Sequence, residues 1–351
     1  MLTPVLVSRI AKVARVYYAC DVGSFLELTV FVCHTQSISG EGSQMVCGKL
    51  RSVPMPASTV SPVPLVSIVM PVYDPHPVHF PEAVDSILRQ TIRDWELLIV
   101  EDPSPRSAAE LLADVDDPRI HHLRWTDKGT LVESRNRGLL EALAPLVACA
   151  DADDVSEPDR LEKQLAYLTE HADVDVLGSQ LAIIDGEGKL TGYRSYPLHH
   201  DAIIRSMRLY SALAQPSVIF KRECVLAAGG YHRFFCEDYE LWGRLARRQA
   251  HFANYPEALV RYRVIPQGIR EAKVPNTLRS TLEIKELYWR DQMGLRGRLR
   301  MWAERVMLWL PPRLVLHLFL KTQHRSGHSA YAKRLEHGLP TAVSPDIGIT
   351  S

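Results

Sequence analysis

Between residues 65 and 155, short apolar runs alternate with runs in which apolar side chains recur at helical spacing. This alternation predicts successive β-α-β units, which build a parallel sheet that helices cover on both faces. The expected strands are residues 65–70, 95–100, 120–125 and 147–150, and the expected helices are residues 81–90, 107–113 and 131–143. The sequence therefore predicts an α/β fold, an αβα sandwich with a mostly parallel central sheet.

Distinctive polar residues follow three of these expected strands. They are residues 71–74 after the first strand, Glu101 and Asp102 after the second, and residues 151–154 after the last. In a parallel sheet the carboxyl ends of the strands meet at one edge, and ligands bind beyond that edge. We therefore expect these segments, which are distant in sequence, to converge on one site.

The last of these segments places three carboxylates within four positions, at Asp151, Asp153 and Asp154. Such carboxylates repel one another unless a positive charge lies between them. Mg²⁺ and Mn²⁺ prefer oxygen ligands and often share them with substrate phosphates. The alternative is a solvated acidic loop, which is the more common meaning of an isolated charge cluster. The neighbouring strand ends favour the metal site.

The pattern continues beyond the acidic segment, although with less regular spacing. We expect a helix that begins with Ser156 as its N-cap, because Pro158 and Asp159 suit a first helical turn. Further strands are expected at residues 174–184, 217–220 and 259–264. A helix is expected at residues 237–245, with acids in its first turn and with Trp242 in the core rather than in a sugar site.

Composition narrows the class of protein and the kinds of partner. The 351 residues carry 41 Lys plus Arg and 41 Asp plus Glu, so no overall basic field exists and no nucleic-acid partner is expected. The six cysteines are scattered without a CxxC pair, which argues against a zinc site or a disulfide framework and suits a reducing compartment. No apolar run reaches the roughly eighteen residues of a membrane span. A cytoplasmic location is expected.

Both ends of the chain differ from the regular middle. Residues 1–64 are interpreted as an extension or linker, and four prolines lie between residues 51 and 64. Two explanations stay open: an accessory segment, or a native start at Met45 or Met55. The second is favoured because the regular pattern begins just after Pro64.

The C-terminal part is predicted to be helical over residues 271–330, followed by a disordered tail at residues 331–351. Residues 296–325 mix Trp and Leu with many Arg, a composition typical of a helix in a membrane interface. This would bring the protein to the inner face of the plasma membrane as a peripheral protein. A pair of helices that packs on the domain explains the pattern equally well.

Several motifs, taken in order, resemble those of the family 2 glycosyltransferases, which have the GT-A fold, a Rossmann-like αβα sandwich. They are residues 67–73 (SIVMPVY), 85–91 (DSILRQT), 99–102 (IVED), 129 with 134–138 (G and SRNRG), 151–154 (DADD), 229–231 (GGY) and 237–242 (EDYELW). Each motif alone is weak, but their order and spacing are specific. The resemblance covers residues 65 to 264 and implies a GT-A domain at residues 65–270 with a C-terminal helical extension.

The resemblance implies a metal-dependent inverting enzyme that moves a sugar from a nucleotide-diphospho-sugar to the hydroxyl of a saccharide or lipid-linked acceptor. Surface polysaccharide or glycolipid synthesis is the implied setting. Asp238, with Glu237 beside it, would be the catalytic base. Asp151, Asp153 and Asp154 would hold Mg²⁺ or Mn²⁺. The donor nucleotide would be bound by Pro71, Val72, Tyr73, Glu101, Asp102, Lys128, Arg135, Asp151 and Arg263.

Two departures and several alternatives accompany this interpretation. Residues 103–105 are Pro-Ser-Pro where the family usually has glycine and serine, and Glu101 stands in place of a more usual aspartate. Asp238 has the alternative of a simple first-turn acid, and Arg135 that of an ion pair with an acid on a neighbouring helix. At the level of function, the alternatives are a nucleotide-sugar-binding regulator without turnover and a dinucleotide-dependent oxidoreductase. No GxGxxG follows the first strand, which disfavours the oxidoreductase.

Overall fold

A computed structural model of the protein describes residues 31–37, 43–49, 63–232, 235–265, 274–311 and 315. The chain divides into two compact units, residues 1–62 and residues 63–351. In the first unit, β1 (Phe31–Ser37) and β2 (Ser43–Lys49) pair in antiparallel orientation. Met45, one of the two proposed native starts, lies in β2, whereas Met55 and the predicted disordered tail at residues 331–351 lie outside the described residues.

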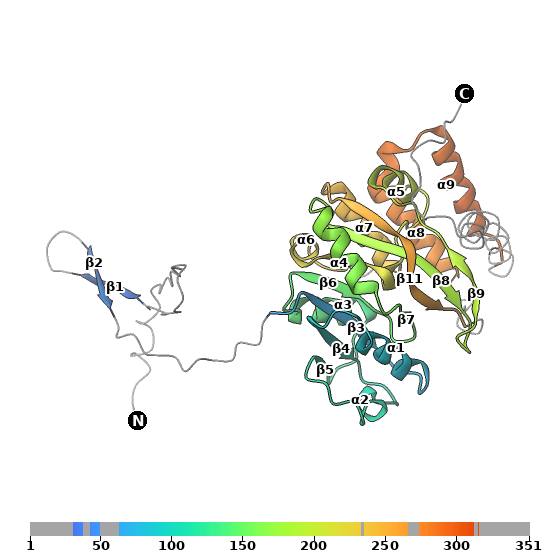
Figure 1. Ribbon diagram of the computed structural model, residues 1–351. Coiled ribbons are helices and arrows are strands. Elements are labelled where there is room, and N and C mark those ends of the chain that lie inside the picture. Colours follow the sequence, from blue (N-terminus) through green and yellow to red (C-terminus); the bar gives the residue numbers. More distant parts are fainter. Residues whose placement is uncertain are drawn as a thin grey trace, which may run out of the picture. The chain divides into compact units, whose positions relative to one another are not determined.

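The second unit is built on a nine-stranded sheet with the order β5-β4-β3-β6-β10-β8-β11-β7, and β9 pairs with β8 outside this path (Figure 1). The strands are β3 (Val66–Val72), β4 (Trp95–Glu101), β5 (Ile120–Arg124), β6 (Leu146–Cys149), β7 (Val155–Ser156), β8 (Val176–Ile184), β9 (Leu190–Arg194), β10 (Ile219–Lys221) and β11 (Phe252–Arg263). The helices are α1 (His79–Leu88), α2 (Ala108–Leu111), α3 (Leu131–Glu141), α4 (Arg160–Glu170), α5 (His200–Met207), α6 (Arg222–Ala227), α7 (Glu237–Arg247), α8 (Val274–Trp289) and α9 (Leu295–Met307).

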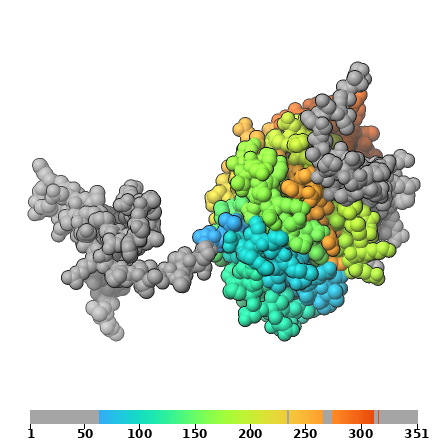
Figure 2. Space-filling view, viewed as in Figure 1, coloured from blue at the N-terminus to red at the C-terminus, as the bar shows by residue number. Residues whose placement is uncertain are grey.

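The predicted parallel sheet is confirmed for β5, β4, β3 and β6, which pair in parallel with one another. β10 then lies antiparallel between β6 and β8, and β8 pairs in parallel with β11. The regular alternation of strands and helices in the sequence stops after β6, and the uninterrupted run of parallel strands stops with it. In the space-filling view, the blue to teal residues that begin this unit lie together at the bottom of the visible face, and green residues lie above them (Figure 2).

The start of α4 was predicted incorrectly. Ser156 is not an N-cap: it lies in β7 and pairs with Val260 of β11, and the helix begins at Arg160 with Asp159 as its N-cap. The Ser156 hydroxyl accepts a hydrogen bond from Arg160 Nη1 at 3.1 Å. A serine followed by proline and aspartate suits a helix start locally, but here the pairing of β7 with a distant strand prevails. The elements β9, α5 and α6 were not predicted.

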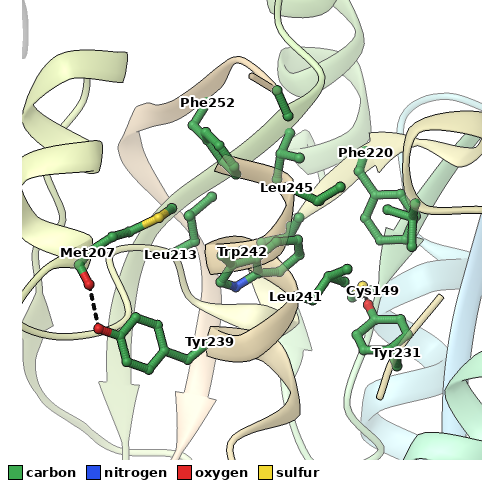
Figure 3. Packing of buried hydrophobic residues seen from close by; sticks show 14 of the residues in the cluster. Cys149, Met207, Leu213, Phe220, Tyr231, Tyr239, Leu241, Trp242, Leu245 and Phe252 are labelled. Atoms are coloured by element: carbon green, nitrogen blue, oxygen red, sulfur yellow. Dashed lines mark hydrogen bonds between the residues drawn. The ribbon is translucent and has the colours of Figure 1, made fainter. Parts of the chain in front are cut away.

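The core of the second unit lies on both faces of the sheet, where two large clusters of apolar side chains are buried. Trp242 is 0% exposed at the centre of one cluster, as predicted, between the labelled side chains of Leu245, Leu241 and Leu213 (Figure 3). The Tyr239 hydroxyl donates a hydrogen bond to the Met207 carbonyl and so ties α7 to α5. This packing fixes the orientation of α7, whose first turn carries Glu237 and Asp238.

The two C-terminal helices continue from this core. α8 packs beside α7: Trp289 is 1% exposed, and the Tyr288 hydroxyl donates to Glu240 Oε1 at 2.5 Å. α9 packs on α8 through the ion pair of Lys285 with Glu304 at 2.7 Å. Among the residues that the structure describes, no helix combines the length and the apolar character needed to cross a bilayer.

Candidate functional site

The three carboxylates that were predicted to bind a metal lie in the loop after β6, at the centre of the sheet. The N–H of Ala150 donates to the Val69 carbonyl at 3.1 Å, so the parallel pairing with β3 extends to the start of the loop. The loop then enters β7, which pairs with the end of β11. The acidic segment therefore stands at the carboxyl edge of the parallel strands, as the sequence predicts.

Asp154 is the innermost of the three carboxylates and is 5% exposed. Its Oδ1 accepts the backbone N–H of Arg263 at 2.8 Å, whereas its Oδ2 is buried without a hydrogen-bond partner. Burial raises the pKa of Asp154 well above its ordinary value, and the charges of Asp151 and Asp153 raise it further. Burial followed by the charge of Asp151 likewise raises the pKa of Asp153. The loop therefore concentrates negative charge that the protein only partly compensates.

We expect Asp154→Asn to stabilise the protein at neutral pH in the absence of metal. Because its pKa is raised in the folded state, ionisation of Asp154 costs stability as the pH rises from the ordinary carboxyl pKa through the raised value. The asparagine oxygen can still accept the Arg263 N–H. The expected gain is on the order of 1 kcal/mol, or about 2–4 °C in Tm. Thermal unfolding in the presence of a chelator measures this gain. The gain should vanish below about pH 3.5, where the carboxyl group is protonated in both the folded and the unfolded state. A lower Tm for the variant at neutral pH would contradict this explanation.

Arg135 joins the acidic loop to the acids of α7. It is 7% exposed, and its Nη2 lies 3.5 Å from Asp151 Oδ1 while its Nε lies 3.6 Å from Glu237 Oε1. Burial alone would lower the pKa of Arg135, but Asp151, Tyr231 and Glu237 raise it above its ordinary value. The guanidinium carbon is 5.6 Å from the centre of the Tyr231 ring. One positive charge thus holds together two acidic groups that are distant in sequence.

Close packing of α3 sets the position of Arg135. At Gly138, a Cβ atom would lie 2.3 Å from Cγ1 of Val69, so only glycine lets the helix approach β3 this closely. Asn136 accepts the N–H of Tyr231 at 2.7 Å and donates to its carbonyl at 2.9 Å. Gly230 has φ +71°, and a Cβ there would meet Asn136 Oδ1 at 2.5 Å. These contacts explain why the motifs around residues 134–138 and 229–231 occur together.

Glu237 and Asp238 occupy the first turn of α7, where the positive end of the helix dipole favours carboxylates. Burial raises the pKa of Asp238, the backbone N–H of Tyr239 and the charge of Arg135 lower it, and Asp151 raises it. For Glu237, burial raises the pKa, Arg135 lowers it and Asp238 raises it. The negative charge of Asp151 raises the pKa of both Glu237 and Asp238. The distant acidic positions therefore converge on one site, as predicted.

Five of the nine predicted nucleotide-binding residues lie at or directly after the carboxyl ends of β3 and β4: residues 71–73, Glu101 and Asp102. Tyr73 is 53% exposed, and its hydroxyl accepts a hydrogen bond from Lys128 Nζ at 2.8 Å. The Val72 carbonyl, next to Pro71, accepts the N–H of Asp102 at 3.0 Å. Tyr73 and Lys128 therefore form an accessible rim, and Asp102 lies behind it.

The Asp102 carboxylate has three partners on one side of the rim. Its Oδ2 accepts the Ser134 hydroxyl at 2.6 Å, and its Oδ1 lies 3.4 Å from both the N–H of Gly129 and Arg137 Nη1. These partners orient the carboxylate, which is 5% exposed, along α3. The cluster links the expected base-binding position to the helix that carries Arg135.

Glu101 does not reach this rim. It is 1% exposed, its Oε1 accepts the N–H of Ala108 at 2.8 Å, and its Oε2 is paired with His122 Nε2 at 2.5 Å. Successive side chains of a strand point to opposite faces, so a residue next to Asp102 points away from it. The interpretation of residues 101 and 102 as a single acidic pair that faces the nucleotide is therefore corrected: Glu101 anchors α2 and β5.

Arg263, a predicted diphosphate ligand, is engaged by the protein on every guanidinium nitrogen. Nε donates to the Asp153 carbonyl at 2.8 Å, Nη2 to Glu82 Oε2 at 2.6 Å and Nη1 to the Asp185 carbonyl at 3.2 Å. Its side chain is 1% exposed. In this arrangement Arg263 holds the acidic loop in place, and the predicted contact with a diphosphate would require the side chain to move.

Two further residues, which belong to no sequence motif, lie near the acids of the site. Arg160 is 1% exposed behind the acidic loop, where its Nη2 donates to the Cys149 carbonyl at 2.9 Å. Burial lowers the pKa of Arg160 to about 10, while Cys149, Asp154 and Asp151 act in the opposite direction. Tyr196 lies close enough to Asp238 for that charge to contribute to its raised pKa, whose largest cause is burial. Only the tertiary fold brings these residues to the acids.

The carboxylates of the acidic loop can hold a divalent cation only together with a bound ligand that also coordinates the cation. Among the described residues, no three His, Cys, Asp or Glu side chains form a group that could hold a metal ion. The buried, unpartnered Oδ2 of Asp154 and the mutual repulsion of the loop carboxylates nevertheless favour a positive charge here. Mg²⁺ is commonly held by one or two carboxylates together with substrate phosphates. The predicted Mg²⁺ or Mn²⁺ therefore fits these residues in combination with a diphosphate.

Comparison with known proteins gives a consistent result. The family described as Glycosyl transferase family 2 matches residues 67–238, which run from β3 through β10 and the acidic loop to the first two residues of α7. The amylovoran biosynthesis glycosyltransferase AmsE of Erwinia amylovora is 25% identical over 236 residues, which cover 64% of this chain and 85% of the relative. An Escherichia coli relative, UDP-Gal:alpha-D-GlcNAc-diphosphoundecaprenol beta-1,3-galactosyltransferase, is 27% identical over 203 residues, or 56% of this chain and 73% of the relative.

A solved structure shows the same fold at low sequence identity. TarS 1-349 of Staphylococcus aureus superposes with a TM-score of 0.52 and 14% identity, over 69% of this chain and 71% of that chain. This likeness concerns the fold, and the predicted GT-A architecture is confirmed.

Proposed function

Since this chain belongs to glycosyltransferase family 2, we propose that it transfers a sugar from a nucleotide-diphospho-sugar to an acceptor hydroxyl by a single, inverting displacement. The observation that carries the proposal is Arg135, which contacts Asp151 on the loop after β6 and Glu237 on α7. A donor bound at the loop would thereby lie next to an acid pair that can act on the acceptor.

The donor nucleotide would bind at the rim beyond β3 and β4. Asp102 supplies a carboxylate acceptor for a base, held by Ser134 and Gly129, and the exposed Tyr73 ring offers a flat apolar surface. Lys128 brings a positive charge to the same rim. This combination suits a planar heterocycle attached to an anionic chain, which is the chemistry of a nucleoside diphosphate.

The diphosphate would extend from this rim toward the acidic loop. There Asp151 and Asp153 would hold Mg²⁺ or Mn²⁺ jointly with it, and Asp154 would support the loop through the Arg263 N–H. When bound, the cation would neutralise the charge that develops on the departing diphosphate. Arg135 Nη2, 3.5 Å from Asp151 Oδ1, would hold that carboxylate in position as an oxygen ligand.

Asp238 would act as the general base. Its carboxylate would take the proton of the acceptor hydroxyl while the oxygen forms a bond to the anomeric carbon and the bond to the diphosphate breaks. The nucleoside diphosphate leaves with the electron pair, and the configuration at the anomeric carbon inverts. The raised pKa of Asp238, caused mainly by burial, makes it a better proton acceptor than an exposed aspartate.

The names of two relatives support the proposed setting and acceptor class. AmsE is named for amylovoran biosynthesis, and the E. coli relative is named for a UDP-Gal donor and a diphosphoundecaprenol-linked acceptor. We accordingly propose a role in polysaccharide or glycolipid assembly, with a saccharide or lipid-linked saccharide as acceptor. UDP-sugars are the first donors to test.

The proposal is tested by incubating the protein with UDP-, GDP- and dTDP-sugars, with and without Mn²⁺, and measuring release of nucleoside diphosphate and transfer to saccharide and lipid-linked acceptors. Metal-dependent transfer that inverts the anomeric configuration supports it. Metal-dependent binding of a nucleotide-sugar without transfer to any acceptor would instead favour a regulator that lacks turnover, and retention of configuration would contradict the single displacement.

Asp153→Asn is expected to weaken metal-dependent donor binding by at least about tenfold, or 1.4 kcal/mol, because it removes one anionic oxygen from a site with few protein ligands. A thermal-shift titration of the nucleotide-sugar in Mn²⁺ measures the change. Asp116→Asn, on an exposed loop, is the matched control and should bind donor like the wild type. Unchanged metal-dependent affinity in the Asp153 variant would place the cation elsewhere.

A further inference from the structure

The outer face of α9 carries a continuous apolar stripe. Its members lie three or four residues apart, which puts them on one side of a helix. They are Leu295 (75% exposed), Leu299 (57%), Trp302 (64%) and Val306 (43%) within the helix, and Trp309 (90%) in the turn that follows its end at Met307. Two tryptophans and three aliphatic side chains this exposed form an apolar surface of the kind that marks an interaction site.

The opposite face of the helix is already used. Met301 is 5% exposed in the core, and Glu304 is paired with Lys285 of α8 at 2.7 Å. A Cβ at Gly297 would come within 3.3 Å of Met293. These contacts fix the rotation of α9 about its axis, so the stripe points away from the domain.

Arginines border the stripe on both sides. At 100° per residue, Arg298 and Arg305 lie along one border, and Arg296 and Arg300 along the other. Arg305 is paired with Glu286 at 2.6 Å and Arg300 with Glu304 at 3.0 Å. Within the part of the chain that the structure describes, Arg296 and Arg298 have no acidic partner. Their charges are available to an external anion on each side of the apolar surface.

We propose that this face of α9 binds the surface of an anionic lipid bilayer. Trp302, Trp309 and the aliphatic side chains enter the boundary between headgroups and acyl chains, where tryptophan is favoured. The bordering arginines reach the lipid phosphates while their aliphatic stems cover apolar surface. The charge on both borders selects this partner over a second protein surface with an apolar groove. The sequence left two explanations open, a membrane-interface helix and a helix packed on the domain. In this proposal both apply to α9, because one face packs on the domain and the other binds the membrane.

This contact would couple the membrane to the acid pair. α9 packs on α8 through Lys285 and Glu304, and α8 packs on α7, where Tyr288 donates to Glu240 in the helix of Asp238. The helices are thus joined from the bilayer surface to the site. The inference itself rests on α9 alone and does not depend on the proposed function, so either can fail without the other.

The test is co-sedimentation of the full-length protein with vesicles of phosphatidylcholine alone or with about 30% phosphatidylglycerol. The wild type is expected to bind the anionic vesicles and to lose binding in high salt. Trp302→Ser/Trp309→Ser should reduce its partition by at least about tenfold, and Arg296→Glu/Arg298→Glu should remove the preference for anionic lipid. Leu140→Ser/Leu143→Ser is the matched control, since Leu140 and Leu143 are 65% and 66% exposed on and beside α3. It should bind vesicles like the wild type.

Thermal unfolding confirms that each variant is folded. The proposal is overturned if the wild type ignores anionic vesicles, or if the tryptophan variant binds them equally well. Light scattering in the absence of lipid provides the other critical outcome: a wild-type dimer that the tryptophan substitutions dissociate would show that the stripe joins two copies of the chain.

Discussion

Asp238→Asn is expected to lower turnover by about 10²- to 10⁴-fold while leaving the affinity for the donor nearly unchanged. The substitution keeps the size of the side chain and its place in the first turn of α7, but it removes the oxygen that would accept the acceptor proton. Donor affinity should persist because Asp151, Asp153 and Asp102 are untouched. Steady-state transfer assays, together with thermal shifts by donor and Mn²⁺, separate the two effects.

The neighbouring acid supplies the control for this prediction. Glu237 Oε1 lies 3.6 Å from Arg135 Nε, and we assign Glu237 to this ion pair and not to proton transfer, so Glu237→Gln should keep much more activity than Asp238→Asn. Burial raises the pKa of Asp238, and the base acts in its ionised form. As the solution is acidified, the wild-type rate should therefore begin to fall at a higher pH than it would if the base were an ordinary aspartate. Normal turnover by Asp238→Asn would assign the base to another residue.

Arg135→Gln should impair both stability and catalysis, because it removes the one positive charge between Asp151 and Glu237. Breaking a buried ion pair in this way costs on the order of 3 kcal/mol. Arg135 also lowers the pKa of Glu237 and Asp238, so these values should rise further in the variant. The acid limb of the rate profile should therefore move to higher pH.

The stability loss in this variant should also depend on pH. With higher carboxyl pKa values in the folded state, the variant loses stability as the pH rises through them and recovers part of it in acid. Arg135→Lys, which keeps the charge but not the planar guanidinium, serves as the second variant if the glutamine form does not fold. It should lie between the wild type and Arg135→Gln in Tm. A glutamine variant with wild-type stability and an unshifted rate profile would show that the bridge is unimportant.

The local parts of the site were predictable from the sequence. The acidic loop follows an apolar strand directly, and the side chains at the ends of parallel strands must share one edge, so the positions of Asp151 and Asp153 followed from the pattern. The first turn of α7 was likewise visible, because acids precede an amphipathic run. The motif resemblance then assigned roles that the pattern alone could not.

The errors arose where tertiary contacts override local pattern. Glu101 adjoins Asp102, but strand alternation turns its carboxylate toward Ala108 and His122. Ser156 has the neighbours of an N-cap, yet pairing with β11 keeps it in a strand. Arg160 and Tyr196 carry no motif, and only the fold places them beside the acids.

The central claim is that acids from the loop after β6 and from α7 serve a single site for a cation, a diphosphate and an acceptor hydroxyl. The most direct measurement is the anomalous scattering of Mn²⁺ in crystals grown with a nucleoside diphosphate. We predict a single Mn²⁺ peak beside the carboxylates of Asp151 and Asp153, in contact with the diphosphate and on the same side of Arg135 as Asp238. A Mn²⁺ peak on another surface, or a nucleotide bound away from the acidic loop, would contradict the account.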